Sequence, residues 1–168
     1  MRAFFRPSAF ALILCLLFCP ALPSCAKTPV AIDLFSDFSA RYGLPEGVVY
    51  DSTAAPGTGA YLDRETFGLL YARADGTDDW EDFESCAIWL GASSARVTEA
   101  AVFVCRDRER ADRLLDLCRR RLALLRSLSD AADVSAADDA VILVRGETVA
   151  YFVLPDNARA ERVFRRLT

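Results

Sequence analysis

The chain has 168 residues, of which 53% are hydrophobic and 26% are charged. This composition is close to the average for globular proteins, so it argues against a disordered chain and against a protein with several membrane spans. Histidine is absent and Lys27 is the only lysine, which removes Ser-His-Asp, Cys-His and Ser-Lys chemistry from any folded cleft. The length predicts a single domain.

The first 24 residues have the features of a secretory signal peptide. Arg2 and Arg6 precede an apolar run over residues 9–18, which is shorter than the roughly 20 residues of a membrane-spanning helix. Residues 22–25, Leu-Pro-Ser-Cys, resemble a bacterial lipobox. That resemblance implies cleavage before Cys25, two acyl chains on the mature N-terminus and anchoring to the outer face of the cell membrane. The alternative is cleavage after Ala26, which would give a secreted soluble protein.

The predicted leader and lipid anchor determine how many cysteines remain free to form disulfides in the domain. With the leader and Cys25 set aside, three cysteines remain in the domain: Cys86, Cys105 and Cys118. An odd number leaves at least one free thiol, and the lack of C-x-x-C spacing and of histidine argues against zinc. We expect buried thiols. A disulfide between Cys86 and Cys105, which flank a predicted turn almost symmetrically, is the alternative outside the cytosol.

The N-terminal part of the domain predicts two short helices and a loop. Thr28 as N-cap and Pro29 at the first position begin a helix over about 29–42, which Gly43 ends. Residues 51–60 predict a loop, after which Asp63 caps a second helix that ends at Tyr71. The acidic stretch 75–84 lacks the spacing and glycine of an EF-hand, so a solvated loop is favoured over a calcium site.

The rest of the chain predicts two hairpins and two helices. Residues 85–91 and 97–105 predict strands joined by 92–95, and residues 141–144 and 149–154 predict a second pair. Helices are predicted over 107–128 and from Asp156 onward. The apolar stripes of these two helices predict the following buried residues: Ala111, Leu114, Leu115, Cys118, Leu122, Leu125, Ala160, Val163, Phe164 and Leu167. Arg121 falls on the apolar side of the first helix, where we expect it to lie along the core edge with its head in water.

The predicted fold class is α+β, with a ββαββα core preceded by short N-terminal helices. The simplest arrangement is a four-stranded, mostly antiparallel sheet with both later helices on one face. The strands are apolar on both sides, which predicts that the second face is also covered, either by the N-terminal helices or by a partner.

The pattern resembles a known family of small lipoproteins from Gram-positive bacteria. Besides the lipobox leader, it rests on Leu70-Tyr71, on residues 99–103 (Glu-Ala-Ala-Val-Phe), on residues 144–146 (Val-Arg-Gly) and on residues 151–153 (Tyr-Phe-Val). The family is the domain of unknown function 4358, and the similarity covers about Val30 to Leu167. It implies location and fold but transfers no catalytic or binding residue.

The sequence favours a non-catalytic binding or adapter module over an enzyme. Carboxylate chemistry is the alternative, with acid pairs drawn from residues 75–84 or from Asp130, Asp133, Asp138 and Asp139, but a domain of this size offers little room for a substrate cleft. A cell-surface ligand-binding protein is a further alternative. No catalytic residue, metal, cofactor or nucleic-acid partner is predicted.

Charge is unevenly distributed over the mature chain. Residues 106–126 contain eight arginines against four acids, and residues 156–168 contain four against two. If both helices lie on one face, they present a basic contact patch for an anionic surface or an acidic envelope partner, formed by Arg113, Arg120, Arg159, Arg162 and Arg166. The alternative is that these arginines are solvated and paired within their own helices.

Overall fold

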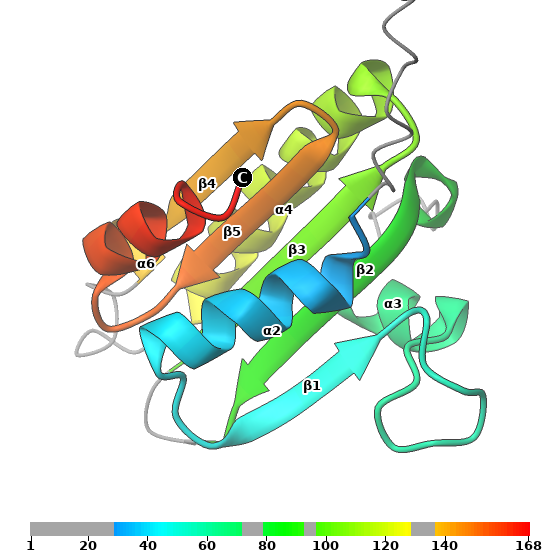
Figure 1. Cartoon of the computed structure of the whole chain (residues 1–168), viewed down its shortest axis with the longest axis horizontal. Helices are drawn as coiled ribbons and strands as arrows, with labels where there is room; N and C mark the ends of the chain where they lie inside the picture. Colours follow the sequence, from blue (N-terminus) through cyan, green and yellow to red (C-terminus); the bar gives the residue numbers. More distant parts are fainter. Residues whose placement is uncertain (1–28, 72–78, 93–96, 129–136) are drawn as a thin grey trace, which may run out of the picture.

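The computed structural model describes residues 29–71, 79–92, 97–128 and 137–168. Their centre is a five-stranded antiparallel sheet with helices on both faces (Figure 1). Along the sheet the order is β1-β2-β3-β5-β4. The strands are β1 (Gly47–Asp51), β2 (Phe83–Gly91), β3 (Glu99–Cys105), β4 (Val141–Arg145) and β5 (Thr148–Val153).

The α+β class and both hairpins are confirmed, but the four-stranded sheet is wrong. The fifth strand, β1, pairs with β2 in a register that places Val49 opposite Trp89. This strand is only five residues long and its burial does not alternate cleanly, so it carries a weak periodicity signal. Gly47 is required at its start, because a Cβ there would overlap the Trp89 indole.

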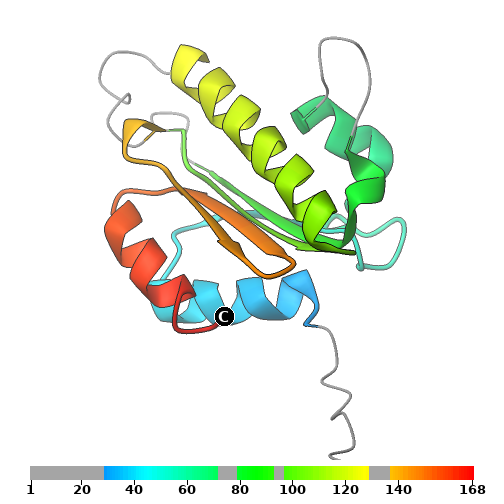
Figure 2. The same ribbon diagram turned by 90° about the horizontal axis from the view of Figure 1, so that it is seen from above.

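The helices cover opposite faces of the sheet, which contradicts the prediction that the two later helices share one face. α3 (Arg64–Tyr71) and α4 (Arg108–Leu128) lie on one side, whereas α2 (Ala31–Tyr42) and α6 (Asn157–Phe164) lie on the other (Figure 2). Alternate residues of β5 serve the two cores: Tyr151 belongs to the α4 side and Phe152 to the α6 side. An apolar stripe shows which side of a helix is buried, but either face of such a sheet can receive it.

On the α4 face, most of the predicted helix stripe is buried. Ala111, Leu114, Cys118, Leu122 and Leu125 are all at most 4% exposed. Leu115, however, is only partly buried, and Leu117 takes a core position instead. The stripe is therefore rotated slightly from the predicted one.

On the opposite face, α2 begins at Ala31 rather than at Pro29. Val30 is its N-cap residue, and the predicted cap Thr28 lies outside the described residues. The Ala31 amide donates instead to Ser85 Oγ on β2, at 2.9 Å. A side chain distant in sequence thus satisfies a donor that local capping normally serves. The predicted end is confirmed, since Gly43 adopts the left-handed conformation with φ of 75°.

The remaining local predictions are largely confirmed. Asp63 caps α3 by accepting the Thr66 amide at 2.7 Å. In α6, Ala160 and Phe164 are fully buried, whereas Val163 and Leu167 are only partly buried against the same core. Gly146, with φ of 59°, begins the two-residue turn between β4 and β5, as a tight hairpin requires.

Candidate functional site

The predicted lipidation site cannot be placed from the structure. Cys25 lies outside the described residues, which begin at Pro29. None of the helices in the described ranges is long and apolar enough to cross a membrane.

The predicted basic patch is not assembled. Arg113 and Arg120 lie on α4, while Arg159, Arg162 and Arg166 lie on or just after α6, on the other face of the sheet. The α4 arginines are also neutralised. Arg113 pairs with Asp82 at 2.8 Å, and Arg120 pairs with Asp79 at 2.7 Å.

The acids of these pairs come from the segment predicted to be a solvated loop. Asp79 and Asp82 are only 3% and 8% exposed, which is unusual for carboxylates unless they are paired. Hydrogen bonds with Asp82 raise the pKa of Arg113 above its usual value. The described part of this acidic segment therefore docks onto α4, while Asp75 and Asp78 lie outside the described residues.

The alternative of a disulfide between Cys86 and Cys105 is not realised. Both are free and buried, as is Cys118. The register places Phe103 opposite Cys86 and Phe83 opposite Cys105, so the two cysteines are not a directly facing pair. Burial raises the pKa of all three thiols, that of Cys105 to about 12.

A buried polar cluster that the sequence did not predict lies under α3. Arg121 on α4 donates from Nη2 to Glu99 Oε2 at 2.7 Å and from Nη1 to the Leu70 carbonyl at 2.9 Å. Glu99 also accepts hydrogen bonds from the hydroxyls of Tyr71 and Tyr151, and these two hydroxyls are 2.6 Å apart. The prediction that the head of Arg121 lies in water is wrong, because its side chain is only 12% exposed.

This cluster joins four elements rather than forming an open site. Glu99 is 2% exposed and Tyr151 fully buried. Burial, and next the charge of Glu99, raises the pKa of Tyr71 and of Tyr151. Burial, the largest single influence, lowers the pKa of Arg121, but the hydrogen bonds to Glu99, the charge of Glu99 and the two tyrosines together outweigh it and raise that pKa. Because every partner is engaged, the cluster fixes α3 and α4 on the sheet and leaves no group free for a ligand.

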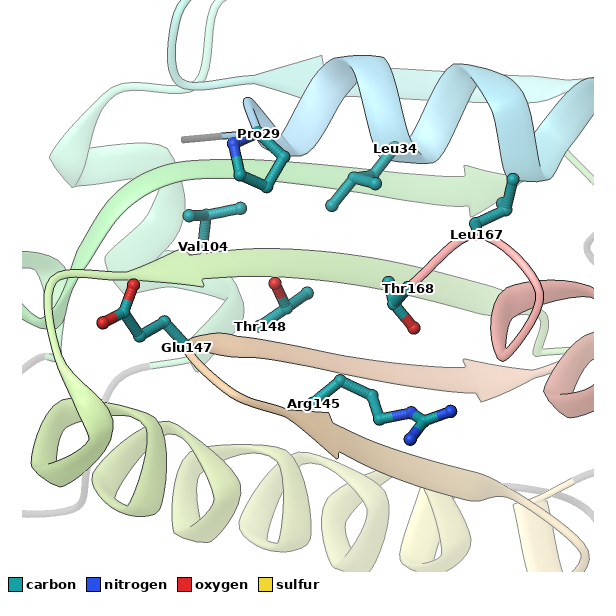
Figure 3. Close-up of a pocket in the computed structure, with 8 residues that line it drawn as sticks. All are labelled: Pro29, Leu34, Val104, Arg145, Glu147, Thr148, Leu167 and Thr168. Carbon is teal, nitrogen blue, oxygen red and sulfur yellow. The ribbon is translucent and has the colours of Figure 1, made fainter. Parts of the chain in front are cut away.

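An open pocket lies on the opposite face, between the start of α2 and the end of the chain (Figure 3). Its volume is about 360 Å³, within the range of small-molecule sites. It combines an apolar surface with three polar residues of the β4–β5 hairpin and with Thr168. The lining residues are Pro29, Leu34, Val104, Arg145, Glu147, Thr148, Leu167 and Thr168.

Strand register explains how the floor of this pocket is built. Arg145 is opposite Thr148, Thr148 is opposite Val104, and Val104 is opposite Ser85. Directly opposed residues project from the same face of a sheet, so these four form one row across β4, β5, β3 and β2. The Glu147 carbonyl accepts the Cys105 amide at 2.7 Å, which fixes the hairpin turn against the end of β3.

Two hydroxyls in this row are used differently. Ser85 Oγ accepts the first amide of α2, whereas the Thr148 hydroxyl has no hydrogen-bond partner among the described residues, although Thr148 is only 7% exposed. A buried hydroxyl without a protein partner is uncommon in native structures. The exposed side chains of Arg145 and Glu147 likewise form no ion pair within the described ranges. Three polar groups around one pocket are therefore available to a ligand.

The sequence predicted the hairpin of residues 141–154 but not this pocket. Its other walls come from the start of α2 and from residues after α6, which only the fold brings together. The unusual signal in the sequence is Thr148 itself, a polar residue that begins an otherwise apolar strand.

Several of the acids considered for catalysis form ion pairs with arginines. Asp79 and Asp82 are paired with arginines, and Asp138 lies 3.6 Å from Arg126. Asp130 and Asp133 lie outside the described residues. Within the described ranges, no group of three or more His, Cys, Asp or Glu side chains is placed to hold a metal ion.

The chain matches no family model, no curated protein sequence and no solved structure.

Proposed function

We propose that this protein is a lipid-anchored, extracytoplasmic binding domain, without catalytic activity of its own, whose ligand occupies the pocket at the β4–β5 hairpin. The observation that carries the proposal is the buried Thr148 hydroxyl, which lines this pocket and has no partner in the described part of the chain. The pocket is open, so water can reach this hydroxyl. A ligand group that replaces the water by a hydrogen bond to Thr148 would contribute about 0.5–1.5 kcal/mol to binding.

Binding is favoured over catalysis by the residues around the pocket. A guanidinium, a carboxylate and two threonine hydroxyls line it, and the chain has no histidine to activate a hydroxyl as a nucleophile. Glu147 contributes the one carboxylate side chain among the described lining residues, whereas glycosidase chemistry requires a pair of Asp or Glu side chains. The resemblance to the domain of unknown function 4358 stays a prediction and is compatible with this proposal.

The predicted anchor would hold the pocket close to the membrane. Pro29, which lines the pocket, is four residues after Cys25, and four extended residues span at most about 14 Å. A ligand bound there would be held near the headgroup layer.

Anchoring is tested by changing Cys25→Ala and separating membranes from soluble material. The variant should leave the membrane fraction, while the control Cys19→Ala, which alters a cysteine of the predicted leader, should remain there. Retention of the Cys25 variant in membranes after a carbonate wash would contradict the predicted anchor.

Binding is tested by thermal shift of the purified chain against probes of separate classes: short peptides, phosphate esters, fatty acids, oligosaccharides and alkylamines. At least one class should raise Tm, and Thr148→Val should reduce the shift. The control Thr58→Val changes a hydroxyl outside the pocket that bonds to the Ala55 carbonyl, and it should leave the shift unchanged. If no class gives a shift that depends on Thr148, the proposed function is wrong.

A second contact with an anionic surface is proposed for the residues at the end of α6. Arg162 and Arg166 are exposed and form no ion pair within the described ranges. Arg166 directly precedes Leu167 and Thr168, which share the pocket with Pro29. The predicted anchor would therefore bring these arginines near lipid headgroups, where each basic residue contributes about 1 kcal/mol.

A further inference from the structure

The two charged residues of the pocket point in different directions. Arg145 and Glu147 diverge from the hairpin turn, and the Thr148 side chain lies between them (Figure 3). Neither is neutralised by another described side chain. The pocket thus presents a positive end, a negative end and a hydroxyl in the middle.

Apolar side chains complete the surface between these charges. Val104, which is 1% exposed, lies beside Thr148 in the row across the sheet, and Leu34 and Leu167 approach from α2 and from the end of the chain. An occupant must therefore place apolar groups against this surface while its charges reach outward in opposite directions.

These features suit a ligand with separated opposite charges. A free amino acid carries both charges on one carbon, and a phosphoethanolamine headgroup separates its charges by only two carbons. Both ligands are therefore too short to extend readily from Arg145 to Glu147. A peptide of two or three residues carries its carboxylate and ammonium at opposite ends, at about 3.3–3.6 Å per extended residue. Its amide groups offer both donors and acceptors to Thr148, whose hydroxyl can act as either.

We propose that the pocket binds a short peptide with apolar side chains and free termini, with its carboxylate at Arg145, its ammonium group at Glu147 and an amide group at Thr148. This inference rests on the proposed binding function and specifies the ligand class.

The experiment is calorimetric titration of the purified full chain with the tripeptide Leu-Ala-Leu and with its N-acetylated, C-amidated and doubly blocked forms. The free peptide should bind most tightly. Each blocking group should weaken binding by about two- to fivefold, the range of an exposed ion pair. Thr148→Val should weaken binding of the free peptide by about two- to tenfold, as for one hydrogen bond.

Two variants test the orientation of the peptide. Arg145→Gln should weaken binding of the free peptide but not of the C-amidated form, and Glu147→Gln should weaken the free peptide but not the N-acetylated form. Arg119→Gln removes an exposed charge from α4, on the other face of the sheet from the pocket, and should change binding of none of the four peptides. Crossed sensitivities of this kind do not arise from partial unfolding, which would weaken all four peptides alike.

Equal binding of the free and doubly blocked peptides would overturn the inference, as would no binding of any form. Tighter binding of glycerophosphoethanolamine than of the peptide would also overturn it, in favour of a lipid headgroup. In these cases a shift in Tm that depends on Thr148 with another probe class would leave the proposed binding function standing, whereas its absence with every class would remove both.

Discussion

Replacing Arg121 by Met should destabilise the protein far more than its place on a largely surface-facing helix suggests. The substitution leaves Glu99, which is 2% exposed, without its cation, and leaves the Leu70 carbonyl without its donor. Loss of one partner from a buried ion pair costs about 3–5 kcal/mol. Because Arg121 retains 12% exposure, water can reach part of this site, and we expect a value near 3 kcal/mol, at the lower end of that range.

The measurement is guanidinium unfolding of the wild type, the single variants and the double variant Glu99→Leu/Arg121→Met. The double variant should lose about 1–3 kcal/mol, because the tyrosine hydroxyls lose an acceptor but no charge is left buried. It should therefore be more stable than Arg121→Met alone. As a matched control, Arg119→Met removes an exposed arginine of the same helix, which pairs with the exposed Asp116, and should change stability by less than about 1 kcal/mol. A loss below about 1 kcal/mol for Arg121→Met, or additive single changes, would refute the buried pair.

Phe164→Ala should reduce the free energy of unfolding by about 3–5 kcal/mol, because the ring is fully buried 5.4 Å from that of Phe152; a loss below about 1 kcal/mol in chemical unfolding would mean that α6 is not docked. The three buried thiols should resist a thiol reagent in the native protein and react in denaturant, with a fourth reacting only if Cys25 is not acylated. The folded pKa values of these thiols lie above the unfolded value of about 8.5, so the free energy of unfolding should keep their full contribution below that pH and fall as the pH rises past it. A free energy of unfolding that stays constant from pH 8 to 11 would contradict their burial. Changing Arg162 and Arg166 together to Gln should weaken salt-sensitive binding to anionic vesicles, and equal wild-type binding to neutral and anionic vesicles would exclude a lipid contact.

The features that could be predicted from the sequence are local elements of secondary structure and their ends. The 108–128 helix, the two hairpins, the Asp63 cap and the Gly43 terminus depend on side-chain periodicity and on conformational preferences within a few residues. These features fix the order of elements and most residues that turn inward. They also predict that both sheet faces are covered, because the strands are apolar on both sides.

Which elements pack against each other, and which of their side chains are in contact, follows only from the tertiary structure. Periodicity places Arg121 and Glu99 on inward sides of their own elements but does not show that they face each other, since that depends on how α4 crosses the sheet. The opposite placement of α4 and α6 and the addition of β1 likewise depend on pairings between distant segments. The pocket has the same origin: register aligns Arg145, Thr148 and Val104, and the start of α2 and the residues after α6 form its other walls. A local pattern specifies which side of an element is buried, whereas its neighbours are selected by the free energy of the whole packed arrangement.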